Sequence, residues 1–319
     1  MKTMFSQFKT RWNVVLLLLV LFSTASGYSA DTTKYKTRYV IVMVMDGPRW
    51  TETWGDSTHQ YIPHMANDMA QHGVIYTNFR NNGPTYTAAG HTAITTGIYQ
   101  GIKNNGLEFP KNPSMFQYWL KATSKARNAA YVIASKDKLA ILTDCRNKKW
   151  KGKYRPYSDC GVNGLYTGYR GDDVTYKNSI RILDSEHPEL VLINFQQPDS
   201  WGHGNNWEKY LSSTKLSDNY IYMVFEFLRT NDFYKDKTTI FVTNDHGRHL
   251  DGHKDGFVSH GDNCEGCRHI NLFAYGPDFK SNVILDTPAE LIDIPVTIGE
   301  LMGFTIEGSD GRVMTELFK

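Results

Sequence analysis

Five short stretches of almost uninterrupted apolar residues stand out along the chain, and each has the length of a buried β-strand. They span residues 39–45, 129–134, 190–195, 239–243 and 270–275. Between them lie longer segments whose mixed composition predicts helices, at residues 62–72, 87–96, 114–123, 172–183, 213–228 and 288–302. Apolar strands that alternate with helices are typical of a sheet covered on both faces. The pattern predicts an α/β fold with a doubly wound, mostly parallel sheet flanked by helices.

The domain organisation follows from the same pattern. No internal repeat or low-complexity segment interrupts the alternation of strands and helices. Residues 31–319 are therefore predicted to form a single catalytic domain. The stretch 145–171 is rich in Lys, Tyr, Gly and Asp and carries no long apolar run. We interpret it as a surface insertion within that domain.

The first thirty residues have the features of an export signal. Three basic residues precede an apolar run at 14–22, and small residues follow it, with Gly27 or Ala30 as the cleavage position. The alternative is a retained membrane anchor, but nine apolar residues are fewer than the roughly 20 that span a bilayer. Residues 1–30 are therefore predicted to be a cleaved signal peptide. The mature protein is expected to be periplasmic or secreted, with no membrane span.

Charge excludes one class of partner. The full chain has 35 basic and 33 acidic residues, and the first thirty residues hold three of the basic ones and none of the acidic ones. The remainder thus has 32 basic against 33 acidic residues, a net charge of −1. Because nucleic-acid-binding surfaces are strongly basic, no such surface is expected.

The four cysteines suit an oxidising compartment, where disulfides persist. They are Cys145, Cys160, Cys264 and Cys267. Four cysteines allow three pairings, and the sequence does not choose among them. We favour a Cys145–Cys160 disulfide that closes the insertion and a local Cys264–Cys267 disulfide, with a structural metal at the CxxC pair as the less favoured reading.

Metal-ligand residue types follow three of the predicted strands. Asp46 follows the first strand, Asp199 and His203 follow the strand at 190–195, and Asp245 with His246 follow the strand at 239–243. Parallel strands bring their carboxyl ends to one edge of the sheet, where ligands bind. Each residue taken alone also has an ordinary structural role, such as a turn or N-cap aspartate. Together they predict a metal site at this edge.

Thr87 lies where a loop ending in Gly83 and Pro84 gives way to a helix. The simplest role for such a hydroxyl is an N-cap. The same position is also favourable for a nucleophile, because free N–H groups and the helix dipole attract phosphate there. A bound Zn²⁺ would lower the proton affinity of the hydroxyl.

The candidate ligands divide into two sets. Asp46, Asp245 and His246, with the Thr87 oxygen, fill one tetrahedral site. The second set has three ligands and an open fourth position, as catalytic zinc sites do: Asp199, His203 and His260. Mixed aspartate and histidine ligands suit zinc, so the cofactor prediction is two Zn²⁺ ions.

Five short motifs follow one another along the chain in the order found in a known protein superfamily. They stand here as Asp46-Gly47, Pro84-Thr-Tyr-Thr87…His91…Thr96-Gly97, Pro198-Asp199-Ser-Trp-Gly-His203, Asn244-Asp245-His246-Gly247 and His260-Gly261. Their order over residues 39–319 resembles the alkaline phosphatase superfamily and is most similar to its nucleotide pyrophosphatase/phosphodiesterase branch. The resemblance implies an alkaline-phosphatase-like fold and hydrolysis of a small-molecule phosphate ester.

The resemblance also implies roles for individual residues. Thr87 would be the nucleophile that is transiently phosphorylated, and the two ligand sets would hold the two zinc ions. Members of this branch have an asparagine that contacts a phosphoryl oxygen. Asn105 corresponds to that asparagine, and Asn104 matches its position nearly as well. The cysteine or serine motif that sulfatases require is missing, which disfavours a sulfatase.

Three functions stay open at this point. A zinc-dependent phosphodiesterase is favoured, because no arginine corresponds to the one that clamps phosphate monoesters in true alkaline phosphatases. The alternatives are a phosphomonoesterase or a phosphonate hydrolase with the same ligands. A catalytically inactive metal-binding module is the alternative outside enzymes.

Overall fold

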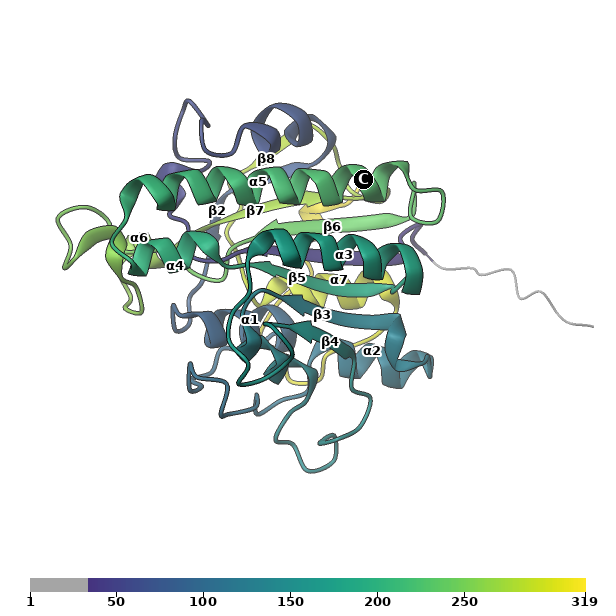
Figure 1. The fold of residues 1–319 in the computed structure, drawn as a ribbon. Helices are drawn as coiled ribbons and strands as arrows, with labels where there is room; N and C mark the ends of the chain where they lie inside the picture. The colour runs from purple at the N-terminus through teal and green to yellow at the C-terminus, as the bar shows by residue number, and fades with distance from the viewer. Residues whose placement is uncertain (1–33) are drawn as a thin grey trace, which may run out of the picture. The chain divides into compact units, whose positions relative to one another are not determined.

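The computed structural model describes residues 34–319, so the predicted signal peptide at 1–30 lies outside the described residues. A nine-stranded sheet forms the centre of the described part (Figure 1). Its strands run β4-β3-β5-β1-β6-β7-β2-β8 across the sheet, and β9 pairs with β2. The bounds are β1 Tyr39–Met45, β2 Val74–Arg80, β3 Ala130–Ala134, β4 Tyr157–Cys160, β5 Leu190–Phe195, β6 Thr238–Thr243, β7 His269–Tyr275, β8 Val283–Leu285 and β9 Ala289–Glu290.

All neighbouring strands pair in parallel except β7, which is antiparallel to both β6 and β2. The fold prediction of a mostly parallel, doubly wound sheet is therefore confirmed. Strand β1 lies at the centre, with β5 and β6 hydrogen-bonded along its two sides. Its alternate residues enter two separate apolar cores, Val42 in one and Met43 in the other. A strand buried on both faces has no polar position, which explains its continuous apolar sequence.

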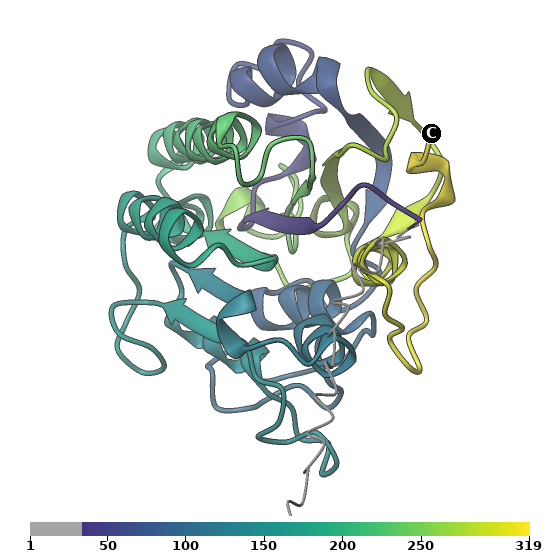
Figure 2. The same cartoon turned by 90° about the vertical axis from the view of Figure 1, so that its right-hand side faces the viewer.

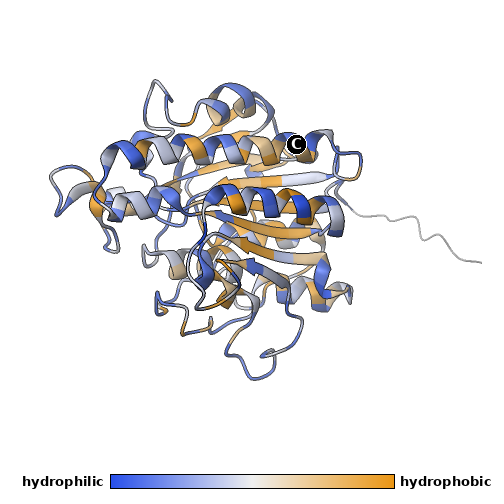
Figure 3. Ribbon diagram, in the orientation of Figure 1, coloured by the Kyte–Doolittle hydropathy of each residue, from blue (hydrophilic) through white to orange (hydrophobic). Residues whose placement is uncertain are grey.

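Helices cover both faces of the sheet (Figure 2). One face is covered by α3 (Asp172–Glu186) and α5 (Trp207–Thr230), which contact each other and the sheet. The other face carries α1 (Thr87–Thr96), α2 (Met115–Thr123) and α7 (Asp293–Met302). Figure 3 shows the apolar residues concentrated on the strands and the inward sides of these helices. Burial of these faces is the main force that holds the layers together.

Several predicted elements differ in the structure. Residues 65–72 form a π-helical and a 3-10 turn instead of an α-helix, and the segment before α7 begins as the short strand β9. Strands β2 and β8 were not predicted. The segment 145–171 is only partly a surface insertion, because it contributes the edge strand β4, which pairs in parallel with β3. Only Cys160 of this strand is buried, so the segment has no apolar run that would reveal the strand in the sequence.

The cysteines also depart from expectation. All four lie within the described residues and are free thiols, so neither expected disulfide is formed. Cys160 is buried at the end of β4, where its Sγ lies 3.5 Å from the Val132 carbonyl oxygen. Among the helices of residues 34–319, none is both long and apolar enough to cross a bilayer.

The carboxyl ends of β1, β3, β5 and β6 meet at one edge of the sheet, on the left in Figure 1. The short helix α4 (Gln197–His203) follows β5 at this edge. Helix α6 (Glu265–Arg268) leads into β7 at the end of the loop that follows β6. This edge carries the predicted metal ligands.

Candidate active site

Thr87 is the first residue of α1 and is almost completely buried. Its predecessor Tyr86 is extended and provides no side-chain cap. The Ala88 N–H donates to Asn104 Oδ1 and the Ala89 N–H to the Tyr86 carbonyl oxygen, so the helix favours an anion beside Thr87 mainly through the positive end of its dipole. Gly90 lets this helix approach the Asp245 backbone, because a Cβ there would lie 2.4 Å from the Asp245 carbonyl oxygen. The glycine therefore places the Thr87 end of α1 against the metal-ligand segment.

The first predicted ligand set comes together from the ends of β1 and β6. His246 Nε2 lies 3.6 Å from Asp46 Oδ1 and 3.4 Å from Asp245 Oδ2. A tetrahedral zinc site with bonds of about 2.05 Å has ligand–ligand edges of about 3.3 Å, close to these spacings. Asp245 Oδ1 and His246 Nε2 are buried and make no hydrogen bond, and Asp245 Oδ2 lies 3.2 Å from His91 Nδ1. Buried polar atoms without a partner are costly, so this set is suited to a cation.

The second predicted set has the same spacing. Asp199 Oδ1 lies 3.4 Å from His203 Nε2 and 3.3 Å from His260 Nε2, and the two histidine nitrogens are 3.0 Å apart. Asp199 and His203 lie at the two ends of one face of α4, four residues apart. Three ligand atoms at mutual distances near 3.3 Å match one face of a zinc tetrahedron. Both sets therefore fit divalent cations.

The histidine rings are oriented for ligation. The Nδ1 atoms of His246 and His260 lie 2.9 and 2.8 Å from the carbonyl oxygens of Gly247 and Thr85. A carbonyl oxygen only accepts, so each Nδ1 carries the proton and each Nε2 presents its lone pair. Burial lowers the pKa of His246 to about 3 and that of His203 to about 4. Both imidazoles are therefore neutral, the form that binds metal, at neutral pH.

Lys136 lies at the centre of the candidate site and was not singled out by the sequence analysis. Its buried ammonium donates to Asp46 Oδ1 at 2.9 Å, to Asp199 Oδ2 at 2.6 Å and to Thr87 Oγ1 at 3.0 Å. Burial lowers the pKa of Lys136, but the facing Asp199 and Asp46 carboxylates outweigh it and hold the pKa above its usual value. One permanent cation thus joins the Thr87 hydroxyl to one carboxylate from each predicted ligand set.

Lys138 and Asn104 extend this cationic region toward the helix. Asn104 Oδ1 accepts from the Ala88 N–H and from Lys138 Nζ, both at 3.0 Å. Burial, and then the neighbouring Lys136, lower the pKa of Lys138 to about 8. Asn105 is exposed, and its side chain accepts from Leu107 N in its own loop. The structure therefore places Asn104, and not Asn105, beside Thr87.

Arg248 holds the second ligand set in place. Its buried guanidinium contacts Asp199 Oδ1 and donates to the carbonyl oxygens of Phe257 and Val258, just before His260. One side chain thereby fixes Asp199 relative to the loop that carries His260. Such outer contacts orient ligands and raise metal affinity. Gly47, with φ near +74°, leaves room for this contact, because a Cβ there would lie 3.0 Å from Asp199 Oδ1.

A sequence signal for the missed residues did exist. Lys136 and Lys138 directly follow β3, so the strand-end rule that selected Asp46 also applies to them. Arg248 follows His246 by two residues. As basic side chains they are not metal ligands, so a pattern of ligand residue types does not include them.

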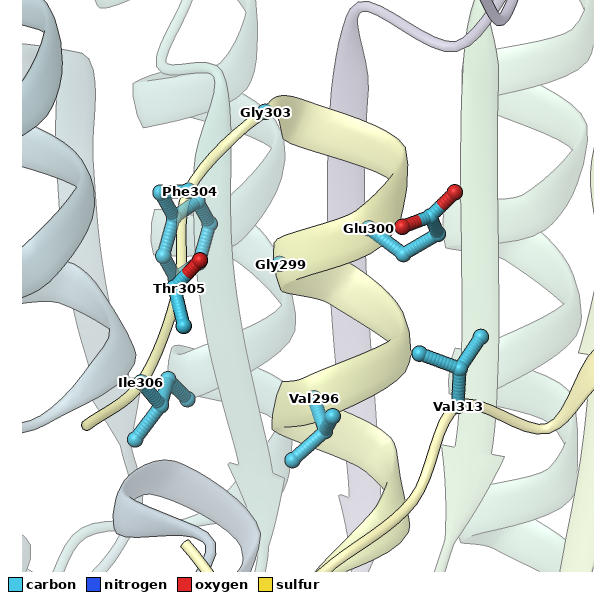
Figure 4. Close-up of a pocket in the computed structure, with 8 residues that line it drawn as sticks. All are labelled: Val296, Gly299, Glu300, Gly303, Phe304, Thr305, Ile306 and Val313. Carbon is cyan, nitrogen blue, oxygen red and sulfur yellow. The ribbon is translucent and has the colours of Figure 1, made fainter. Parts of the chain in front are cut away.

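A pocket elsewhere in the described residues does not compete with this site. It lies along α7 and the segment that follows the helix, and Figure 4 shows its lining residues. The lining is mainly apolar, and its one carboxylate, Glu300, is already bound to Lys34 and Tyr35. No predicted metal ligand or nucleophile lines it.

Comparison with known proteins decides the family. Residues 40–250 match the family of type I phosphodiesterases and nucleotide pyrophosphatases. The chain belongs to this family. It is also 24% identical over 281 residues to GPI ethanolamine phosphate transferase 1 of Candida glabrata, a match that covers 81% of this chain and 29% of the transferase. The chain thus spans less than a third of that relative's length.

Solved structures of this fold show the same architecture. Murine ectonucleotide pyrophosphatase/phosphodiesterase 5 superposes with a TM-score of 0.62 at 14% identity, over 88% of this chain and 100% of the murine chain. A phosphonate monoester hydrolase from Silicibacter pomeroyi gives a TM-score of 0.62 at 15% identity, over 87% of this chain and 76% of the hydrolase. The chain therefore has the alkaline phosphatase superfamily fold.

Proposed function

We propose that this protein is an exported, zinc-dependent hydrolase of phosphodiesters that acts through a phosphothreonine on Thr87. The observation that carries the proposal is the position of the Thr87 hydroxyl. It lies 3.0 Å from Lys136 Nζ, which also binds Asp46 of one ligand set and Asp199 of the other. A nucleophile at a helix N-terminus, between two metal-ligand sets, suits in-line displacement at phosphorus.

The ligand sets would hold two zinc ions, one at Asp46, Asp245 and His246 and one at Asp199, His203 and His260. His246 also lies within ligand distance of Asp199 and His260. When bound, these ions supply positive charge for the attacking and departing oxygens and lower the proton affinity of the hydroxyl. Family membership supports this use of the site.

The chain's own residues then perform two displacements. Thr87 Oγ1 gives its proton to solvent and bonds to phosphorus while the bond to the ester's leaving oxygen breaks, and that oxygen takes up a proton from solvent. Lys136 stabilises the negative Thr87 oxygen before attack. Water then attacks the phosphothreonine, the bond between Thr87 Oγ1 and phosphorus breaks, and the hydroxyl is restored. The Asn104 amide, whose oxygen is fixed by Ala88 N and Lys138, is positioned to donate to a non-bridging phosphoryl oxygen.

A specific observation favours a second function. Lys136 places one ammonium group 3.0 Å from Thr87 Oγ1, and Lys138 places a second one 3.0 Å from Asn104 Oδ1, whereas the diester preference rested on the lack of an arginine clamp. Two cations match the extra negative charge of a phosphate monoester or a phosphonate. Hydrolysis of such dianionic substrates is therefore the second candidate.

Chromogenic substrates distinguish these functions. Zinc-loaded protein is assayed with bis-p-nitrophenyl phosphate and p-nitrophenyl phosphate, and the zinc content of each sample is measured. We expect a preference for the diester, and a loss of turnover of about 10⁴-fold or more in Thr87→Ala. The variant should keep its zinc, and Thr87→Ser should keep part of the activity because it retains a hydroxyl.

Each other outcome has a definite meaning. A monoester preference supports the phosphatase candidate. No turnover of either ester by the zinc-loaded wild type supports an inactive metal-binding module. Full activity in Thr87→Ala contradicts the assignment of the nucleophile.

A further inference from the structure

A second group of metal-ligand side chains lies outside the active site, in the loop between β6 and β7. It consists of His249, His253, Asp262 and Cys264, whose ligand atoms all lie within 4.8 Å of one another. Asp262 Oδ2 is 3.2 Å from His249 Nε2 and 2.9 Å from His253 Nε2. The two imidazole rings are nearly perpendicular, with centroids 4.9 Å apart. We refer to these four residues as the loop cluster.

His249 is oriented as a metal ligand. Its Nδ1 lies 3.0 Å from Asp255 Oδ1, and Ser259 donates to the same carboxylate oxygen at 2.6 Å. With its proton on Nδ1, the ring presents the Nε2 lone pair toward Asp262. The side chain is 2% exposed, and Nε2 makes no hydrogen bond. A carboxylate that fixes the outer nitrogen of a buried histidine is the arrangement seen around bound zinc.

One cationic side chain, that of Lys254, contacts the loop cluster. Lys254 Nζ lies 2.7 Å from Asp262 Oδ2, the oxygen that faces both histidines. The Lys254 side chain is 56% exposed, so it can withdraw into solvent when another cation takes its place. The partly exposed His253 leaves the cluster accessible to an ion from outside.

We propose that the loop cluster binds a structural zinc ion through His249, His253, Asp262 and Cys264. One thiolate, two imidazoles and one carboxylate are four ligands of the types that tetrahedral zinc accepts. With four protein ligands no position is left for water or substrate, which indicates a structural and not a catalytic ion. On binding, the Cys264 thiol releases its proton to solvent and a sulfur–zinc bond forms.

A bound ion would restrain the loop between β6 and β7. The four ligands bracket residues 254–261, and His260 lies two residues before Asp262. An ion at the loop cluster would therefore fix both ends of the segment that carries His260. This site is independent of the proposed function, because none of its ligands belongs to the Asp46 or Asp199 sets.

A matched set of variants tests the proposal. The full mature protein is loaded with Zn²⁺, freed of excess ion and analysed for zinc per chain. We expect His253→Ala and Cys264→Ser each to lose one zinc relative to the wild type. The control Lys254→Gln, next to His253, should keep the full count and bind the loop ion at least as tightly, because it removes the competing ammonium.

Cobalt provides the second measurement. Co²⁺-substituted wild type should show the intense near-ultraviolet absorption of a cobalt–thiolate bond, and Cys264→Ser should lose it while keeping its other cobalt bands. Because the comparison is between wild type and variant, the result does not depend on how many ions the active site holds. A wild type that shows the thiolate band but lacks active-site zinc would support the loop site and count against the proposed function.

Two results would overturn the proposal. One is equal zinc content in the wild type, His253→Ala and Cys264→Ser. The other is a Cys264–Cys267 disulfide, detected as a chain two hydrogens lighter in which neither thiol reacts with an alkylating reagent.

Discussion

Replacing Lys136 by methionine tests whether the buried ammonium organises the active site. Methionine has a similar length and fits an apolar space but carries no charge. The substitution leaves the Asp46 carboxylate, which is 0% exposed, without the ammonium that binds it at 2.9 Å. Asp199, which is 5% exposed, loses the ammonium at 2.6 Å but keeps its contact with Arg248. It also removes the donor 3.0 Å from Thr87 Oγ1.

The size of the effect follows from these contacts. Removing one partner of a buried ion pair costs about 3–5 kcal/mol. With an unfolding entropy of about 2.1 cal/mol/K per residue, summed over residues 34–319, metal-free Lys136→Met should melt about 5–8 °C below the metal-free wild type. Zinc should reduce this difference, because it supplies positive charge to the same carboxylates. Loss of one preorganised donor should lower kcat/KM by about 10²–10³-fold.

Calorimetry of the metal-free and zinc-loaded forms measures the first effect, and chromogenic ester hydrolysis measures the second. Lys125→Met is the matched control, because Lys125 forms a partly exposed ion pair with Glu189. Such surface pairs contribute about 1 kcal/mol or less. An unchanged melting temperature in metal-free Lys136→Met, or unchanged kcat/KM, would refute the assigned role.

Two further predictions concern substrate binding. Asn104→Ala should lower kcat/KM by about 10²-fold, while Asn105→Ala leaves it nearly unchanged, and equal losses in steady-state assays would contradict the placement of Asn104. Because the pKa of Lys138 is lowered to about 8, its charge is present below that pH and is lost as pH rises through it. KM for an anionic ester should therefore rise above about pH 8, and Lys138→Arg should move that rise to higher pH; an identical KM profile in the variant would exclude Lys138 as its cause.

The sequence alone predicted the main features of the fold. Strands such as Tyr39–Met45 and Leu190–Phe195 were located to the residue, because a strand buried on both faces must be apolar throughout. Helix α1 was also located to the residue, because Gly83 and Pro84 mark the end of the preceding loop. The half-exposed edge strand β4 has no such pattern and was read as a loop.

The candidate site also has residues that the sequence predicted and residues that it did not. Aspartates and histidines at strand ends are conspicuous in a sequence, because charged groups there interrupt apolar runs and parallel topology brings those ends together. The sequence thus predicted Asp46, Asp199 and Asp245 as metal ligands, and their ligation of zinc is part of the proposed function.

Only the tertiary structure decided which cations face those carboxylates. Lys136 is ninety residues from Asp46 in the chain, and it binds that carboxylate because β3 and β1 end at the same edge of one sheet. Likewise, Asn104 and Asn105 are equivalent in sequence, and only the course of the loop turns the first toward Ala88 and the second toward Leu107. Residue type sets what a side chain can do, but the packing of distant segments sets which partner it meets.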